Sequence, residues 1–381
     1  MKLIILLTSL FVMTNVAALS EKETMSEVAG SVVKLIPYIS DVKKFKDPKN
    51  EKVIKDRLQY ILKAFQTSKK GKRISRPEFQ ATYKVMLEHL DETIQSFDTD
   101  HKEFAYKKIR ATSQLCMSCH NMVKGEKKGF VRSMNKVRSD DFANNFDYAE
   151  FLYLTRDYRK AERTYRKWTD FVTSKVTKKN SLADDLVFRA AVKVMTINLS
   201  VYFSPKKARS YLDRTLLSKN LTPVLKEELK DWNDSLVKWM QWKRPVKVDA
   251  KFLNKFIATY LTPLESEGEI ISESKIMPTL FIAKGVMDQF LKTAKRDEMV
   301  ATAMYWKAIS ERLIGFSYFY SLADMQLKTC ITEFPKSKIA KKCYAEYERQ
   351  VVLGYSGSGG ISVPDDVKAE LIELKSLISH K

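Results

Sequence analysis

The segment PEFQATYKVMLEHLDETIQSF, residues 77–97, has the pattern of a helix that buries one face. Its large apolar residues recur every three or four positions, the spacing of one side of an α-helix. These are Phe79, Tyr83, Met86, Leu90, Ile94 and Phe97. Ser75 and Glu78 form a capping-box pattern, and Pro77 suits the first helical turn. The segment therefore predicts a helix roughly 30 Å long whose apolar face packs against other helices.

Three further amphipathic helices are predicted between residues 22 and 124. Apolar stripes run from Met25 to Ile39, from Ile54 to Phe65, and from Phe104 to Leu115. Short connections between helices favour antiparallel neighbours. We therefore expect an up-down-up-down four-helix bundle over residues 21–126.

The composition favours an all-α protein. Only 11 glycines and 10 prolines interrupt 381 residues, and long stretches are rich in Lys, Glu, Leu and Ala. A chain of this length exceeds one typical hydrophobic core, so two or more domains are expected. No paired carboxylates, nucleophile arrangement or phosphate-binding loop points to a hydrolase or a transferase.

The fourth predicted helix ends in ATSQLCMSCHNMVKG, residues 111–125, which contains Cys116, Cys119 and His120. The spacing C-x-x-C-H is the attachment signature of c-type haem. Two thiols three positions apart can bond to the two vinyl groups of one haem, and the next histidine offers an imidazole to the iron. A zinc site would need more ligands nearby, and a redox-active dithiol would favour a βαβ setting. The sequence therefore predicts one covalently attached haem c.

Residues 22–124, with this motif on the last helix, resemble the cytochrome c′, cytochrome c556 and cytochrome b562 group of four-helix-bundle haem proteins. The resemblance covers just over a quarter of the chain. It implies that His120 is the proximal iron ligand and that Met25, near the start of the first helix, is the distal one. Of the residues that follow the histidine in this family, the basic one matches Lys124, whereas the aromatic one is absent.

The position of Met25 also follows from the predicted topology, because the start of the first helix and the end of the fourth lie at the same end of the bundle. His89 and His101 are too far along the bundle axis from His120 to be the second ligand. An open sixth coordination position is the main alternative to Met25.

The region 141–353 is predicted to be a degenerate helical-repeat domain after a linker at 127–140. Two segments resemble tetratricopeptide helix pairs, the first with small and aromatic residues from Ala149 to Tyr165 and the second around Cys330. An irregular helical domain is the alternative. The break at Phe334-Pro335 should fold one helix back on another and allow a disulfide between Cys330 and Cys343. Residues 354–381 are predicted to be a flexible linker and a C-terminal helix.

The first 20 residues predict an export signal. Lys2 precedes a short apolar run from Leu3 to about Met13, and the small residues Ala18 and Ser20 suit cleavage. The run is shorter than the roughly 20 residues of a transmembrane helix. We therefore expect a periplasmic or otherwise exported protein that is soluble once the signal is removed.

The chain is strongly basic, with 67 Lys and Arg against 46 Asp and Glu, a net charge of +21. On a cytosolic protein this charge would suggest nucleic acid, but nucleic acid is not an expected partner of an exported protein. The charge then favours an acidic protein surface, an anionic membrane surface or a cell-wall polymer. The alternative is that the lysines only solvate helix faces.

Together these features predict one-electron transfer by an exported monohaem cytochrome whose repeat domain docks a redox partner. We expect an electron carrier rather than an enzyme. Two other hypotheses stay open. If the sixth coordination position of the iron is empty, the protein would be a haem sensor or a peroxidase-like protein. If the haem has a secondary role, the protein would be a helical-repeat scaffold.

Overall fold

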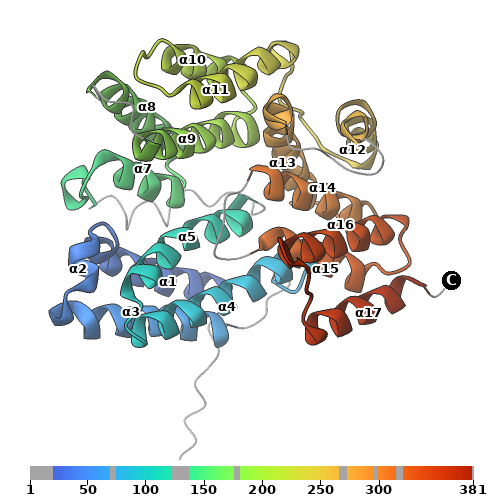
Figure 1. Ribbon diagram of the computed structural model, residues 1–381, viewed down its shortest axis with the longest axis horizontal. Helices are drawn as coiled ribbons and strands as arrows, with labels where there is room; N and C mark the ends of the chain where they lie inside the picture. Colours follow the sequence, from blue (N-terminus) through green and yellow to red (C-terminus); the bar gives the residue numbers. More distant parts are fainter. Residues whose placement is uncertain are drawn as a thin grey trace, which may run out of the picture.

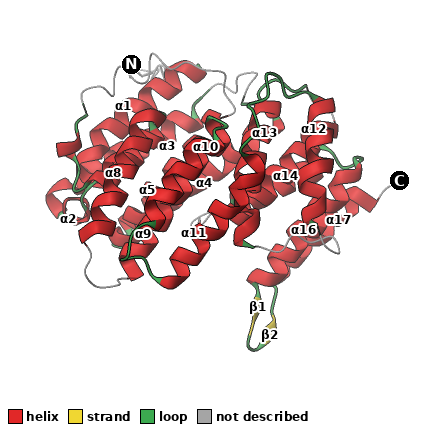
Figure 2. Ribbon diagram, turned by 90° about the horizontal axis from the view of Figure 1, so that it is seen from above, coloured by secondary structure: helices red, strands yellow, loops and turns green. Residues whose placement is uncertain are grey.

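The computed structural model describes residues 20–68, 74–121, 137–175, 181–265, 273–295, 298–314 and 321–379. These residues form an all-α structure with one small β-hairpin, which confirms the predicted class (Figures 1 and 2). The predicted export signal lies outside the described residues except for Ser20, as do residues 127–136 of the predicted linker. Within the described part of the chain, no helix combines the length and the hydropathy needed to cross a membrane.

The first group of helices covers residues 21–121. It comprises α1 (Glu21–Ile39), α2 (Val42–Lys46), η1 (Pro48–Asn50), α3 (Glu51–Gln66), α4 (Pro77–Asp98) and α5 (Lys102–Asn121). Helix α1 packs on α3, α3 on α4, and α4 on α5, whereas α1 and α5 touch much less. Large side chains such as Leu58, Leu90 and Phe97 fill the space between them, which we call the first core.

Two local features of this group differ from the sequence predictions. The chain forms an additional helix, α2, whose Phe45 is fully buried and packs edge-on against Phe97 with ring centroids 5.3 Å apart. The N-cap of α4 is Arg76, so the capping box predicted from Ser75 and Glu78 is wrong. Glu78 instead pairs with Arg76, because its carboxylate is buried and needs a cation nearby.

The second group covers residues 139–379 and contains a larger hydrophobic core, which we call the second core. Its helices up to residue 264 are η2 (Ser139–Asp141), α7 (Asn145–Leu154), α8 (Tyr158–Lys175), α9 (Ser181–Met195), η3 (Thr196–Val201), α10 (Pro205–Leu216), α11 (Pro223–Ser235), η4 (Leu236–Trp239), α12 (Ala250–Phe256), η5 (Ile257–Leu261) and η6 (Thr262–Leu264). The remaining helices are η7 (Ser274–Ile276), α13 (Met277–Leu291), α14 (Glu298–Ile314), α15 (Leu322–Glu333), α16 (Lys338–Gly354) and α17 (Asp365–Ser379). Figure 1 shows α7–α11 above the first group and α13–α17 beside it.

The two groups pack directly on each other. Helix α15 lies along α4, and α7 packs on α5. The Arg76 guanidinium donates to the carbonyl oxygens of Leu291 and Ala294 at the end of α13, the second at 3.4 Å. The Ser40 hydroxyl donates to the carbonyl of Asp141 at 3.3 Å. The first group is therefore held against the second by hydrogen bonds as well as by apolar contacts.

The carboxyl end of the chain is anchored on the second group. A two-stranded antiparallel hairpin, β1 (Ser356–Gly357) and β2 (Gly360–Ile361), stands where the sequence predicted a flexible linker. Gly360 has a φ of +104°, which a residue with a side chain adopts only with strain. Helix α17 packs against α15 and α16 beyond the hairpin, with Leu371 and Leu374 buried.

Cys330 on α15 and Cys343 on α16 form the predicted disulfide pair, with an S–S distance of 2.17 Å and Cα atoms 6.4 Å apart. Both side chains are fully buried between the two helices. The pair therefore closes the turn between two helices that already pack on each other.

Replacing both cysteines by alanine, C330A/C343A, should lower the free energy of unfolding by about 2–4 kcal/mol, because the bond closes a short loop in the unfolded chain. Urea unfolding of the variant and of the oxidised wild type measures the difference. Reduced wild type is the control and should resemble the variant. Equal midpoints for the oxidised wild type and the variant would contradict a stabilising disulfide.

Candidate cofactor site

The two cysteines of the C-x-x-C-H motif lie in the last two turns of α5, at the boundary between the two cores. Cys116 and Cys119 are partly buried and are not joined to each other. Residues three apart on a helix lie on one side of it, one turn apart. Cys116 packs against the first core and Cys119 against the second. The motif is thus the point at which α5 contacts both cores.

Both thiols are held in their protonated form. Burial raises the pKa of Cys116 to about 12, and the neighbouring Cys119 adds to the effect. Burial likewise raises the pKa of Cys119 to about 11, although the positive charge of Lys307 and a hydrogen bond with Thr82 oppose it. Redox-active dithiols depend on a lowered thiol pKa. The environment of these cysteines therefore differs from that of a thioredoxin-like pair.

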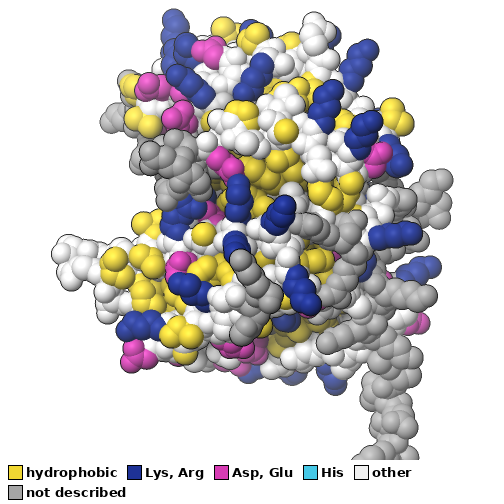
Figure 3. Space-filling model, turned by 90° about the vertical axis from the view of Figure 1, so that its right-hand side faces the viewer, with side chains coloured by type: hydrophobic (Ala, Val, Ile, Leu, Met, Phe, Trp, Pro, Cys, Tyr) yellow, Lys and Arg dark blue, Asp and Glu magenta, His cyan; other side chains and the backbone are white. Residues whose placement is uncertain are grey.

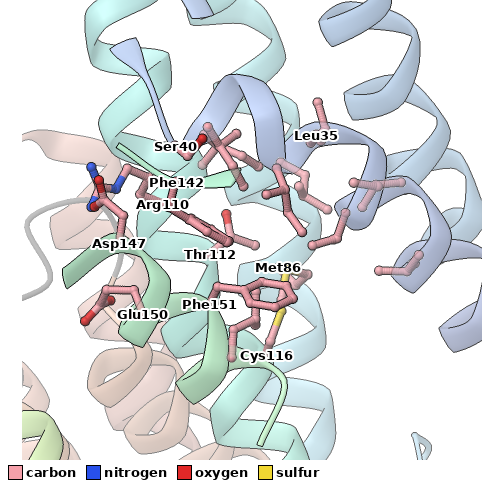
Figure 4. Close-up of a pocket in the computed structure, with 18 of the residues that line it drawn as sticks. Leu35, Ser40, Met86, Arg110, Thr112, Cys116, Phe142, Asp147, Glu150 and Phe151 are labelled. Carbon is pink, nitrogen blue, oxygen red and sulfur yellow. The ribbon is translucent and has the colours of Figure 1, made fainter. Parts of the chain in front are cut away.

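A pocket lies between α1 and α5, and Cys116 is part of its wall (Figure 4). Most of its lining is apolar. Helices α1, α3 and α4 contribute Val28, Val32, Leu35, Ile36, Ile39, Ile61, Phe65, Met86 and Leu90, and the second group contributes Phe142, Phe151 and Leu154. The room for water-sized molecules is about 90 Å³, which is smaller than a typical ligand pocket of about 300–1,000 Å³.

Charged side chains from three helices line the other end of the pocket. Arg110 of α5 pairs with Asp147 of α7 and donates to the hydroxyl of Tyr106 at 3.0 Å. Glu150, also on α7, lies 3.6 Å from the Nζ atom of Lys193 and accepts a 2.5 Å hydrogen bond from Tyr165. Figure 4 shows Arg110, Asp147 and Glu150 away from Cys116. We call this set, together with Arg189 of α9, the charged end of the pocket.

The two carboxyl groups of the charged end respond differently to burial. Burial opposes the ionisation of Glu150, but the charges of Lys193 and Arg189 outweigh it, and the pKa of Glu150 is lowered. For Asp147, burial outweighs the charge of Arg110, and its pKa is raised. Glu150 therefore stays ionised more firmly than Asp147, and the surroundings of Glu150 favour a negative charge.

The structure places the predicted site residues as follows. Cys116 lines the pocket, and the backbone of α5 continues through His120, whose side chain lies outside the described residues. Met25 lies in the second turn of α1, partly buried against the first core, one turn before the pocket residue Val28. Met25 itself is not part of the pocket wall.

His89 and His101, which the sequence ranked below Met25, lie elsewhere in the first group of helices. His89 of α4 is buried, and its Nε2 atom lies 2.8 Å from the carbonyl of Lys108 and 2.9 Å from the hydroxyl of Thr112. His101 is exposed beside Thr99 at the start of α5. His380 lies outside the described residues.

Sequence reasoning missed two kinds of pocket residue. Met86 was recognised only as part of an apolar stripe, yet it lines the same pocket as Cys116. Arg110, Asp147 and Arg189 resemble ordinary surface charges in the sequence. Their places depend on how α7 and α9 pack on α5, which helical periodicity does not show.

The residue types at this site suit a covalently attached macrocycle. Of the two thiols with the required spacing, Cys116 lines an apolar pocket, and Cys119 follows one turn later on α5, outside the pocket wall. Two arginines and two carboxylates lie at the far end of this pocket. The space of about 90 Å³ is too small for such a ring. Binding would therefore require α1 and α5 to move apart, and α1 packs mainly on α3 whereas α5 packs mainly on α4.

Glu150→Gln should reduce the free energy of unfolding at pH 7 by about 1–3 kcal/mol, the usual cost of losing hydrogen bonds to a charged group. Since the pKa of Glu150 in the folded protein lies below its ordinary value of 4.5, its carboxylate stabilises the fold at neutral pH. This contribution is lost as the pH falls through the lowered pKa. Urea unfolding at pH 7 and pH 4 should show a difference between variant and wild type that shrinks in acid.

The matched control for this prediction is Glu227→Gln, which changes an exposed carboxylate on α11. Its effect should be small at both pH values. A Glu150→Gln effect that is constant with pH would show that the carboxylate is not held ionised by its surroundings.

Searches against protein-family models, curated proteins and solved structures found no match for this chain.

Proposed function

We propose that this protein is an exported monohaem c-type cytochrome that carries single electrons, with the first group of helices as a four-helix haem bundle. The observation that carries the proposal is the placement of a C-x-x-C pair. Cys116 lines an apolar pocket, Cys119 follows one turn later, and the next residue on α5 is a histidine. The chemistry of the motif and the chemistry of the pocket support the same kind of cofactor.

In this proposal each part of the site has a defined role. Cys116 and Cys119 hold the haem through thioether bonds, and His120 gives its imidazole to the iron. The bound haem supplies one-electron iron chemistry. The apolar side chains of α1 and α4 keep water away from the pocket and thereby help to set the reduction potential.

The proposed distal ligand is Met25 of α1, and the structure adds Met86 of α4 as a competitor. Met25 belongs to the helix that faces α5 across the pocket, whereas Met86 is itself part of the pocket wall together with Cys116. The thioether of either residue can bind iron. The two are distinguished by changing each methionine separately.

The second group of helices is proposed to be a tetratricopeptide-like domain that docks a redox partner. With a net charge of +21, attraction to an acidic partner would be long-ranged. On the face shown in Figure 3, Lys and Arg side chains are spread over the surface instead of forming one patch. This distribution suits steering of an acidic protein better than a single tight contact.

The test is the optical spectrum of protein produced in a periplasm with haem-attachment machinery. We expect one covalent haem by intact mass and a low-spin spectrum with a methionine–iron charge-transfer band when oxidised. Met25→Ala should remove the band, while Met86→Leu should keep it. The reverse result would assign the ligand to Met86.

Two results would contradict the proposal. If the wild type carries no covalent haem and behaves like a C116A/C119A control, the protein is not a c-type cytochrome. A high-spin spectrum that shifts with carbon monoxide and is unchanged in both methionine variants would replace electron transfer by gas binding or peroxide chemistry at an open iron position.

A further inference from the structure

A second and larger pocket lies within the second group of helices. Its room for water-sized molecules is about 480 Å³, within the range of about 300–1,000 Å³ that is typical of ligand pockets. Its described wall comes from α9, α11, α13 and α14 and from the short segments before α11 and α13. None of these described wall residues belongs to the first group, so this pocket is separate from the C-x-x-C motif.

The charged side chains in the wall of this pocket are all acidic. The described part of the wall has no Lys or Arg, but it has the four carboxylates of Asp184, Asp185, Glu228 and Glu273. No ion pair joins any of the four to another described residue. In the whole chain, by contrast, Lys and Arg outnumber Asp and Glu by 67 to 46. A concave, acidic wall in a basic protein attracts a cation locally.

Glu228 is held in the wall by two hydrogen bonds. Its Oε1 atom accepts a 2.9 Å hydrogen bond from the indole N–H of Trp232, and its Oε2 atom accepts one from the hydroxyl of Ser274. Neither donor is charged, so the negative charge of Glu228 is not neutralised, and a carboxylate has lone pairs for further donors. Trp232 is fully buried and also packs on the ring of Phe188, with centroids 5.5 Å apart. One buried side chain thus positions both a carboxylate and an aromatic ring of the pocket.

The uncharged part of the wall indicates which kind of cation fits. The ring of Phe188 is half-buried, and Met277 and Leu313 are buried apolar side chains. A hard metal ion takes oxygen ligands on every side, which this wall does not offer. Ammonium groups joined by methylene chains suit it better. Carboxylates bind the ammonium groups, the aromatic ring attracts a cation, and the apolar side chains cover the methylenes.

We propose that this pocket binds a linear diamine or polyamine, a small molecule with two or more ammonium groups separated by methylene chains. The carboxylates come from three places in the chain, namely α9, α11 and the residue before η7. Separate ammonium groups of one ligand can therefore each meet a carboxylate. This function is additional to the proposed electron transfer and does not depend on a bound haem.

The experiment is isothermal titration calorimetry of the full-length protein with spermidine at low salt. We expect saturable binding that weakens as the salt concentration rises, because salt screens the attraction between exposed charges. Hexanediol, which has a methylene chain without charge, should not bind. The C116A/C119A variant should bind spermidine like the wild type.

Glu228→Gln keeps the size of the side chain and removes its charge, so it should weaken spermidine binding about tenfold, the usual effect of losing a hydrogen bond to a charged group. Asp185→Asn should also weaken binding, and because Asp185 is exposed this variant should fold even if Glu228→Gln does not. Glu227→Gln is the matched control. It changes an exposed neighbour of Glu228 outside the described wall and should bind like the wild type.

Three results would overturn the inference. The wild type could show no binding of spermidine, or the pocket variants could bind it as tightly as Glu227→Gln. The third result is binding of Ca²⁺ without binding of spermidine, which would make the pocket a metal-ion site. These failures are distinct from failure of the proposed function, which is shown by the absence of covalent haem from the intact mass of the wild type.

Discussion

The position of α5 between two cores is the constraint on which the rest of the structure depends. One side of the helix packs on α4 in the first core, and another side meets α7 of the second group. The two cysteines of the C-x-x-C pair are one turn apart on α5, and Cys116 contacts the first core whereas Cys119 contacts the second. A change in the packing of either group would therefore shift α5 and with it the two cysteines.

Buried charges hold the second group in place at this boundary. Lys307 of α14 is almost fully buried, lies 3.0 Å from a carboxylate oxygen of Asp288, and is near enough to Cys119 to influence its thiol. Buried ion pairs add little net stability because both partners lose water, but removing one partner is costly. The pair joins α14 to α13, and the loss of either partner would leave a buried charge unpaired. Arg76, which bonds to the end of α13, has a similar effect on α4.

Features that depend on a local pattern could be predicted from the sequence, whereas features that depend on contacts between distant residues could not. The apolar stripe of residues 77–97 predicted a helix that the structure places at Pro77–Asp98, because a long stripe needs no knowledge of its neighbours. Helix α2 has only five residues, which is too short for a periodic pattern. The N-cap of α4 and the charged end of the pocket depend on contacts between residues far apart in the chain. Arg76 and Arg189 look like solvated surface residues until α13 and α7 are in place.

The small volume of the pocket bears on how a large cofactor could be accommodated. The pairs α1–α3 and α4–α5 pack extensively, while α1 and α5 touch little, so separating α1 from α5 preserves the larger interfaces. The lining that would be opened is mostly aliphatic and aromatic, and exposing it to water is unfavourable. A ligand that fills the opened space restores that burial, and binding to the folded chain alone stabilises it further. A ring bound in the opened pocket would therefore act as part of the first core.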